Sequence, residues 1–305
     1  MPPHIVVIGS SNTDMVIKAD HIPVPGETVL GGEFVMVPGG KGANQAVAAA
    51  RLGAEVTFVA RVGDDAFGRA AIESFRREGI DTEFIAMDPK AASGVALIFV
   101  DKAGENSIAV APGANGRLSP EDVARARPAV EKADVVVVQF EIPMETVEAG
   151  MLLAKECGTR AMINPAPAAP APREILAMAD VLIPNRLEAA TLLGGASGEP
   201  CWLAERLLET GAGAVVITLG SDGALAAAGG TRLRIPAFKV EAVDTTAAGD
   251  AFTGAMAVAL AEGSDLETAA RFASCAAAIS VTRMGAQSSL ASREEVEGLV
   301  DGADG

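Results

Sequence analysis

Positively charged residues are scarce in this sequence. The 305 residues include 24 Lys and Arg against 40 Asp and Glu, so the net charge is −16 and the isoelectric point is about 4.6. Nucleic acids and anionic membrane surfaces are bound by basic patches, and we therefore expect neither as a partner. Small phosphate ligands are compatible with this charge, because backbone N–H groups and metal ions can hold them.

Cysteine is also rare, and long apolar runs are missing. Cys157, Cys201 and Cys275 are widely spaced and form neither a CxxC pair nor a metal-ligand pattern. An odd number of isolated cysteines argues against a disulfide framework and favours reduced thiols in a cytoplasmic protein. Residues 1–9 are typical of a first β-strand and have no basic region of the kind that begins a signal peptide. No uncharged apolar run approaches the ~18–20 residues of a membrane span.

Two common nucleotide-binding motifs are lacking. Residues 9–12 follow the first apolar run but have only the first glycine of a dinucleotide fingerprint, which disfavours an NAD-binding domain. Residues 39–42 look like the end of a P-loop. However, Lys41 is followed by glycine instead of Ser or Thr, and Val35 takes the place of the first glycine. This segment can still expose backbone N–H groups at the start of a helix.

What the sequence does contain is a regular alternation of strand and helix patterns. Half of its residues are hydrophobic, which is ample for one large domain. The apolar, β-branched runs are residues 5–8, 56–60, 95–100, 135–139, 161–164, 181–184 and 215–219. The helical patterns are residues 41–52, 67–78, 144–157, 187–193, 202–209 and 250–262. Continuous apolar strands alternating with helices predict an α/β fold with a doubly wound, mostly parallel sheet flanked by helices.

Two segments depart from this alternation. Residues 15–37 and 93–112 contain strand patterns and turn residues without helices between them. We expect them to form a small β-sheet lid over the carboxyl ends of the main strands, inserted in a single α/β domain that spans residues 1–305. A pair of surface hairpins would give the same periodicity.

The most informative segment is residues 244–250, Asp-Thr-Thr-Ala-Ala-Gly-Asp, followed by a run of small residues. Here a turn containing glycine places Asp250 on the first turn of a helix. The N–H groups of Ala247, Ala248 and Gly249 would have no partner within the helix and could bind an anionic oxygen. A carboxylate base beside such an anion hole suits phosphoryl transfer to an alcohol. An ordinary helix start, with Asp250 favoured by the helix dipole, is the alternative.

Several polar side chains lie where strands end or helices begin. Asn12 and Asp14 follow the first strand, Asn44 is on the first turn of the next helix, and Glu141 ends another strand. Each alone is more often a cap or turn residue than a ligand. Together with Asp250 they indicate a site for the hydroxyl groups of a sugar.

Two further segments have both a structural and a functional interpretation. Asn185 and Glu188 match a capping box at a helix start, but they could equally face phosphates and the water shell of Mg²⁺. The segment from Thr218 to Gly223 allows close approach of backbone to a phosphate or to the adenosine ribose, yet a plain hairpin turn fits it as well. The residues alone do not decide between these interpretations.

Taken together, these motifs resemble the PfkB-type carbohydrate kinase family, in its ribokinase branch, over essentially the whole chain. Residues 244–250 match the catalytic signature of that family in its Ala-Ala-Gly-Asp form. Residues 38–46, Pro-Gly-Gly-Lys-Gly-Ala-Asn-Gln-Ala, match its second signature, and residues 25–28 and 164–168 point the same way. The resemblance implies ATP-dependent phosphorylation of the 5-hydroxyl of D-ribose.

The resemblance also implies a role for individual residues. Asp250 would be the base, with Ala247, Ala248 and Gly249 around it. The sugar would contact Asn12, Asp14, Gly40, Lys41, Asn44, Glu141 and Asp250. ATP would bind Asn185, Glu188, Thr218, Gly220, Ser221, Gly223, Gly249 and Ser274. The sequence departs from the pattern of the family at Ser274, where many members carry histidine, and at Arg186, where an acidic residue is usual.

The family further implies a monovalent cation, usually K⁺, and pairing of two subunits through their lid sheets into a homodimer. The positions that match its cation site, several of them through backbone carbonyls, are Asp244, Thr246, Ser280, Arg283, Gly285 and Ser289. A helix-packing loop held by Asp244 and Arg283 is the structural alternative.

Other functions are left as alternatives. Deoxyribose differs from ribose by one hydroxyl and would change few contacts, and fructose is another small sugar of the same kind. An adenosine-like substrate would call for more aromatic surface than 4% aromatics and no tyrosine provide. A non-catalytic sugar-binding module is disfavoured by the presence of Asp250 together with Asn185 and Glu188.

Overall fold

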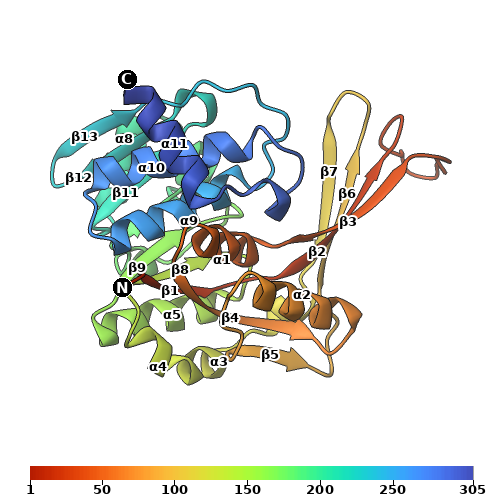
Figure 1. Ribbon diagram of the computed structural model, residues 1–305, viewed down its shortest axis with the longest axis horizontal. Coiled ribbons are helices and arrows are strands. Elements are labelled where there is room, and N and C mark those ends of the chain that lie inside the picture. The colour runs from red at the N-terminus through yellow and green to blue at the C-terminus, as the bar shows by residue number, and fades with distance from the viewer. Residues whose placement is uncertain (305) are drawn as a thin grey trace.

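A nine-stranded sheet forms the centre of the molecule, for which the computed structural model describes residues 1–304. Its strand order is β13-β12-β11-β10-β9-β8-β1-β4-β5 (Figure 1), and all neighbours are parallel except at the β12 and β13 edge. The parallel strands are β1 (His4–Ile8), β4 (Glu55–Gly63), β5 (Ile85–Asp88), β8 (Val135–Gln139), β9 (Arg160–Asn164), β10 (Val181–Leu182) and β11 (Ala214–Thr218). The antiparallel edge consists of β12 (Ala224–Ala228) and β13 (Thr231–Ile235).

Helices cover both faces of this sheet. One face packs against α1 (Lys41–Arg51), α2 (Ala66–Arg77), α9 (Ala248–Ala261), α10 (Leu266–Ser280) and α11 (Arg293–Asp304). The other packs against α3 (Pro120–Arg125), α4 (Arg127–Val130), α5 (Met144–Cys157), α6 (Arg173–Leu176), α7 (Arg186–Leu192) and α8 (Pro200–Leu208). Short 3₁₀ turns are η1 (Gly113–Arg117), η2 (Gly220–Asp222) and η3 (Gln287–Ser289). In the part of the chain described, no helix has the length and apolarity needed to cross a bilayer.

The strand sequences explain why the sheet is covered on both faces. Successive side chains of a strand point to opposite faces. In β1, Ile5 and Val7 join the core on one side, while Val6 and Ile8 join the core on the other. A strand buried on both faces is apolar along its interior, as residues 5–8 of β1 and 135–138 of β8 are. The predicted doubly wound α/β fold is confirmed.

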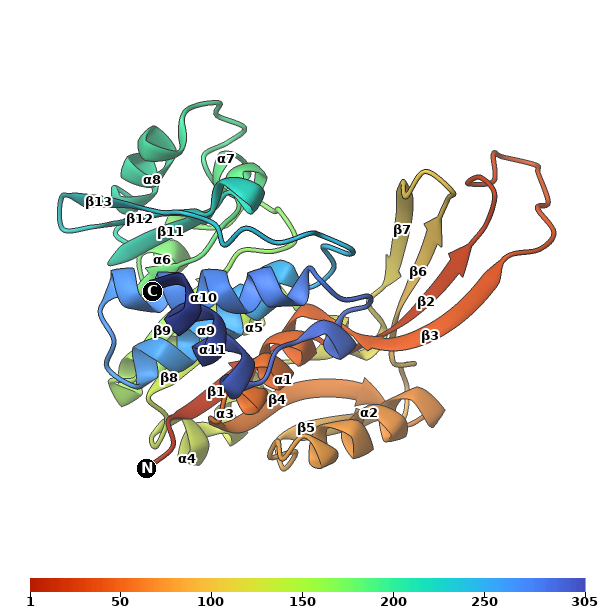
Figure 2. The same cartoon turned by 45° about the horizontal axis from the view of Figure 1, so that its top comes forward.

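A smaller four-stranded sheet projects from the main body (Figures 1 and 2). Its order is β3 (Glu33–Gly39), β2 (Asn12–Lys18), β6 (Gly94–Val100) and β7 (Asn106–Ala111). The small sheet expected from the turn-rich segments is therefore present. The pairing of β2 with β3 already begins at Asn12 opposite Gly39, so the strands reach further toward the main sheet than their apolar patterns suggest.

The two faces of the small sheet differ in what they present. Met36 pairs with Met15, which in turn pairs with Leu97, so these three side chains share one face. Met36 and Leu97 are exposed, as is Phe34 on the same face. Asp14 lies one position from Met15 and therefore points to the opposite face. The face that carries Asp14 is not purely polar, because Val35, Ile108 and Val110 are exposed on it.

Helices α1 and α9 pack unusually close to one another. A Cβ atom at Gly254 of α9 would lie 2.7 Å from Ala48 Cβ and 2.9 Å from the Gln45 carbonyl oxygen of α1. Only glycine therefore fits at this crossing. The close approach brings the amino-terminal turns of both helices together, and the polar residues of the candidate site lie on these turns.

Candidate active site

Asp250 lies buried between α9 and α1. It occupies the first turn of α9 and is 5% exposed. Asn44 Nδ2 donates a hydrogen bond of 2.9 Å to Asp250 Oδ2, and Gln45 Nε2 donates one of 3.0 Å to Oδ1. Two amides from one turn of α1 therefore fix both oxygens of the carboxylate.

The amide of Gln45 extends this network to the main sheet. Gln45 Nε2 also donates to Asn164 Oδ1 at 3.0 Å, and Gln45 Oε1 accepts from Gln139 Nε2 at 2.7 Å. Asn164 Nδ2 donates in turn to the carbonyl of Ile183 at 2.8 Å. The carboxyl ends of β8 and β9 thereby orient the group that holds Asp250. Sequence reasoning assigned no role to these three amides, although Gln139 is a polar residue at the end of an otherwise apolar run.

Burial raises the pKa of Asp250 above its ordinary value of 3.8. The ammonium of Lys41 and the two amide donors, Asn44 and Gln45, act in the opposite direction, while Glu141 adds to the increase. The group is thus a stronger base than a solvated carboxylate and still has partners for its negative charge.

Lys41, the first residue of α1, lies among four carboxylates. Its burial disfavours the ammonium, but Asp250, Glu141, Glu188 and Asp14 together outweigh this effect and raise the pKa of Lys41. The cation therefore stays charged at neutral pH. These carboxylates come from α9, the β8–α5 loop, α7 and β2, so Lys41 is where distant segments of the chain meet.

Glu141 binds the amino terminus of α1. Its Oε2 accepts hydrogen bonds from Ser10 Oγ at 2.5 Å and from the backbone N–H of Lys41 at 3.0 Å. The hydroxyl of Ser10 also accepts from the N–H of Gly42 at 3.3 Å. The carboxylate predicted as a sugar ligand therefore has a capping role too, and Ser10 is a partner that sequence reasoning did not assign.

The turn before α1 places its backbone against the start of β2. Gly40 caps the helix with φ 92°, and a Cβ atom there would lie 2.7 Å from the backbone nitrogen of Asn12. Glycine is therefore required for both the conformation and the close approach. Asp14, two residues along β2, shares the face of Asn12 and packs over Gly39, where a Cβ atom would lie 2.2 Å from Asp14 Oδ2.

Asp14 has the most clearly perturbed acidity of the group. Burial raises its pKa to about 6, with further contributions from the negative charges of Glu141 and Asp250, and Lys41 lowers it in part. An ionised carboxylate that is buried beside other carboxylates destabilises the folded protein. Its retention is what a ligand-binding role would require.

The start of α9 adopts a strained backbone conformation. Ala247 has φ 60° and ψ 9°, and among residues 1–304 it is the one non-glycine residue with positive φ. Such a conformation costs alanine of order 1 kcal/mol. It directs the chain from the loop into Ala248, where α9 begins, while Gly249 remains exposed. The residues of the predicted anion hole thus form the first turn of the helix that carries Asp250.

Asn185 and Glu188 form the capping box that their spacing indicated. Asn185 Oδ1 accepts from the N–H of Glu188 at 2.9 Å, and Glu188 Oε2 accepts from the N–H of Asn185 at 2.7 Å. Glu188 is nevertheless buried, which raises its pKa, whereas the Asn185 N–H and Lys41 lower it. Its charge therefore acts on the same cluster as Asp250. Thr218, at the end of β11, pairs with Asn185 through a parallel bridge.

The remaining residues predicted to bind nucleotide lie on two elements. Gly220 and Ser221 are exposed in η2, and Gly223, with φ 87°, closes the turn that joins β11 to β12. A Cβ atom at Gly223 would lie 2.0 Å from the carbonyl oxygen of Ile235, so the hairpin itself demands glycine. Ser274 is buried in α10, and its hydroxyl has no hydrogen-bond partner in the described structure.

The predicted cation residues are only partly brought together. Asp244 Oδ1 accepts from Thr246 N and Oγ1 at 2.9 and 2.7 Å, and Asp244 Oδ2 accepts from Gly285 N at 2.8 Å. Although burial acts the other way, these bonds lower the pKa of Asp244. The hydroxyls of Ser280 and Ser289 donate to nearby carbonyls, and the Arg283 side chain pairs with Glu295. Within residues 1–304, no cluster of His, Cys, Asp and Glu could hold a metal by itself.

Comparison with known proteins decides the class of the site. Residues 2–293 match the pfkB family carbohydrate kinases. The chain belongs to this family. The resemblance inferred from the motifs is confirmed, and the enzyme is a phosphotransferase that acts on an alcohol group.

Several relatives match along nearly their whole length. The chain is 44% identical to a ribokinase of Bacillus subtilis over 297 residues, covering 97% of this chain and 99% of that protein. It is 39% identical to a deoxyribokinase of Salmonella typhimurium over 298 residues, covering 95% and 96%. The structure of Arabidopsis thaliana ribokinase, solved with ribose and ATP, matches with a TM-score of 0.89 and 31% identity over 98% of this chain and 99% of that chain.

The acidity of Asp14 predicts how its substitution changes stability. Because the folded pKa of about 6 lies above 3.8, the folded protein binds more protons than the unfolded chain between these values, and the carboxylate destabilises it above pH 6. We expect Asp14→Asn to raise the free energy of unfolding by about 1–3 kcal/mol at pH 8, and the gain to vanish below about pH 4. Urea denaturation of both proteins at the two pH values measures it. An equal or lower stability of the variant at pH 8 would contradict the buried charge.

Proposed function

We propose that this enzyme transfers the terminal phosphoryl group of ATP to the 5-hydroxyl of D-ribose, giving ribose 5-phosphate and ADP. The observation that carries the proposal is Asp250: a buried carboxylate with a raised pKa, held at the start of a helix by Asn44 and Gln45. The ribokinases among the relatives, and the ribose and ATP in the Arabidopsis structure, support this choice of substrates.

In the reaction, Asp250 accepts the proton of the attacking hydroxyl. A carboxylate is a weak base at neutral pH, but the transition state of phosphoryl transfer is loose and the hydroxyl loses its proton late. Burial raises the basicity of Asp250 for this step. The backbone N–H groups of Ala247 and Gly249 stabilise the charge on the transferred phosphoryl group, and that of Ala248 would join them by giving up its 3.3 Å hydrogen bond to the Thr245 carbonyl. Closure of the small sheet would exclude water and so limit hydrolysis of ATP.

The sugar contacts are assigned to Asn12, Asp14, Gly40, Lys41, Asn44 and Glu141. Asn44 supports this assignment directly, because its Nδ2 holds Asp250 while its Oδ1 is buried without a partner in the described structure. An unsatisfied buried carbonyl costs about 1–3 kcal/mol. A sugar hydroxyl that donates to Asn44 Oδ1 would recover this energy on binding. Asp14 is a second acceptor for the sugar, and Lys41 is a donor.

For the nucleotide we assign Asn185, Glu188, Thr218, Gly220, Ser221, Gly223, Gly249 and Ser274. The unpartnered hydroxyl of buried Ser274 fits a ligand that offers it a hydrogen bond. Mg²⁺, when bound with ATP, would neutralise charge on the phosphates. To Glu188 we assign the orientation of the water shell of that ion, and its burial in the same charge cluster as Lys41 supports this assignment.

Three further assignments are part of the proposal. K⁺ would bind beside Asp244, Thr246 and Gly285, which already converge, with backbone carbonyls as the other ligands. A homodimer would form through the exposed apolar face of the small sheet, where Met36 and Leu97 lie. We further place the enzyme in the cytoplasm, with neither nucleic acid nor membrane as a partner, on the strength of its isolated cysteines and acidic charge.

The role of Asp250 can be tested by Asp250→Asn. The new amide keeps the shape of the side chain, and its oxygen can still accept the hydrogen bond from Asn44 Nδ2, so Asn44 Oδ1 stays available to the sugar. The variant lacks the base, and we expect kcat to fall roughly 10²–10⁴-fold. Ribose affinity, measured by calorimetry, should change little by comparison. Turnover equal to that of the unsubstituted enzyme would refute Asp250 as the proton acceptor.

Deoxyribose is the second candidate, because a deoxyribokinase is 39% identical to this chain. A site that hydrogen-bonds each ring hydroxyl rejects a sugar that lacks one of them. We therefore expect kcat/KM for ribose to exceed that for 2-deoxyribose by roughly 10-fold or more. Rates with ATP and Mg²⁺ should be compared for ribose, 2-deoxyribose, fructose and adenosine. A higher kcat/KM for any of the other three would replace ribose as the substrate, and no ATP consumption with any of them would indicate a binding module.

A further inference from the structure

Asn115 is a buried side chain that holds the start of β2. It lies in η1 and is 1% exposed. Its Oδ1 accepts from the N–H of Ser11 at 2.9 Å, and its Nδ2 donates to the carbonyl of Ser11 at 3.1 Å and to Asn12 Oδ1 at 2.7 Å. One amide therefore makes three hydrogen bonds to two consecutive residues that are more than one hundred positions away.

These bonds determine which atom Asn12 can offer to a ligand. The Oδ1 atom of Asn12 is occupied by Asn115, so its Nδ2 is the part of the amide left to face the sugar. The packing allows little freedom, because a Cβ atom at Gly94 would lie 2.2 Å from both Asn115 Nδ2 and Asn12 Oδ1. Asn12 consequently presents a hydrogen-bond donor, and Asp14 on the same face presents an acceptor.

We infer that Asn115 is a positioning residue for the sugar: it orients the Asn12 amide so that its Nδ2 donates to a hydroxyl oxygen of the substrate. The inference rests on the proposed function in one respect, namely that Asn12 binds the sugar. The orientation of this donor is then determined by Asn115, which does not itself touch the substrate.

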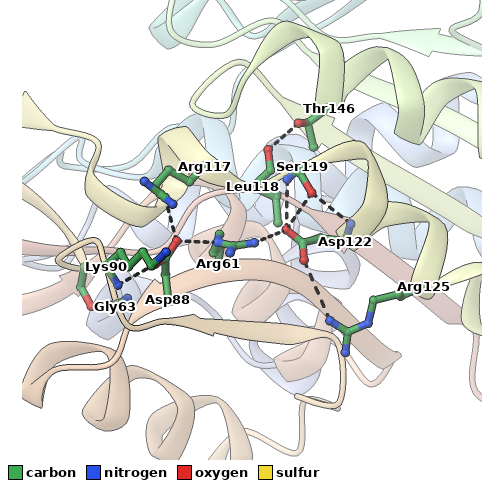
Figure 3. A network of polar contacts seen from close by, with 11 residues as sticks. Arg61, Gly63, Asp88, Lys90, Arg117, Leu118, Ser119, Asp122, Arg125 and Thr146 are labelled. Atoms are coloured by element: carbon green, nitrogen blue, oxygen red, sulfur yellow. Dashed lines mark hydrogen bonds and ion pairs between the residues drawn. The ribbon is translucent and has the colours of Figure 1, made fainter.

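An ion-pair network at the edge of the main sheet holds η1 just beyond Asn115, through Arg117 (Figure 3). Arg117, two residues further along η1, donates through Nε to Asp88 Oδ2 at 2.8 Å. Arg61 donates to the same oxygen at 2.9 Å and to Asp122 Oδ2 at 2.6 Å. The backbone N–H of Lys90 and the two guanidinium groups lower the pKa of Asp88 to about 2, so the network is intact at any neutral pH.

This network lies where the chain returns from the small sheet to the main sheet. Strand β7 ends at Ala111 and η1 follows directly, while the outward path from β5 to β6 begins at Asp88. The two paths are joined by a hydrogen bond of 2.8 Å from Ala114 N to the carbonyl of Ala92. Asn115 on η1 therefore links Asn12, at the start of β2, to the two segments that connect the small sheet with the main sheet.

The direct test is Asn115→Asp. The new carboxylate keeps the size of the side chain and still accepts from the N–H of Ser11, but it places an oxygen against the Ser11 carbonyl and Asn12 Oδ1. Asn12 must then turn its amide and show the sugar an acceptor instead of a donor. We expect KM for ribose to rise roughly 10-fold, with kcat and KM for ATP within about threefold of the unsubstituted enzyme.

A pair of arginine variants provides a second test that leaves the buried amide intact. Arg117→Met removes the link from η1 to Asp88 and should raise KM for ribose severalfold. Arg117→Lys keeps a cation there and should leave KM for ribose close to that of the unsubstituted enzyme. Arg125 is the matched control: it is exposed and lies 4.0 Å from Asp122 at the far end of the network. Arg125→Met should leave both KM values unchanged.

The outcomes separate this inference from the proposed function. If the unsubstituted enzyme does not phosphorylate ribose, the proposed function fails, and the same KM comparison is made with the sugar that it does accept. If Asn115→Asp leaves the sugar KM unchanged, the positioning role is overturned. An equal rise in both KM values with a fall in kcat would show general damage and would overturn it too. If Asn115→Asp does not fold, the Arg117→Met variant decides: an unchanged sugar KM in that variant would overturn the positioning role as well.

Discussion

The site depends on one electrostatic constraint: the half-buried ammonium of Lys41 and the carboxylates around it must compensate each other's charge. Burial disfavours the charge of Lys41, but Asp250, Glu141, Glu188 and Asp14 together outweigh this effect, and Lys41 lowers the pKa values of Asp250, Asp14 and Glu188 in return. Since the four carboxylates come from four separate segments and Lys41 from a fifth, the charge cluster forms only when the whole fold is assembled. A buried ion pair contributes little net stability, so its value lies in the placement of Asp250 and Asp14.

The close packing of α1 against α9 also positions Asp250. Glycine at position 254 lets α9 approach α1 closely enough for Asn44 and Gln45 to reach Asp250. The unfavourable features of the site are then offset by the large core on both faces of the sheet. They include the αL conformation of Ala247 and the unpartnered Oδ1 of Asn44. Strain and unsatisfied groups that gather at one place are typical of a functional site.

The sequence predicted the alternating architecture because many of its strands and helices have a local pattern of their own: residues 144–157, for example, form α5 as expected. Helices α10 and α11 and the edge strands β12 and β13 were not predicted. It also indicated the segments that carry the site, since Asn44 and Asp250 meet. It could not reveal Asn115, whose partners Ser11 and Asn12 lie more than one hundred residues away, nor Gln45 as the link to Asn164. Such contacts follow from tertiary packing, and a lone asparagine in a turn gives no local sign of them.

The central claim is that burial raises the pKa of Asp250 and that the charge of Lys41 lowers it in part. It is tested most directly by ¹³C NMR titration of aspartate carboxyl groups, with the Asp250 signal identified by its loss in Asp250→Asn. We expect this signal to titrate above 3.8 in the unsubstituted enzyme and at higher pH still in Lys41→Met, because the opposing charge is gone. A titration at or below 3.8, or one that Lys41→Met leaves unchanged, would contradict the account.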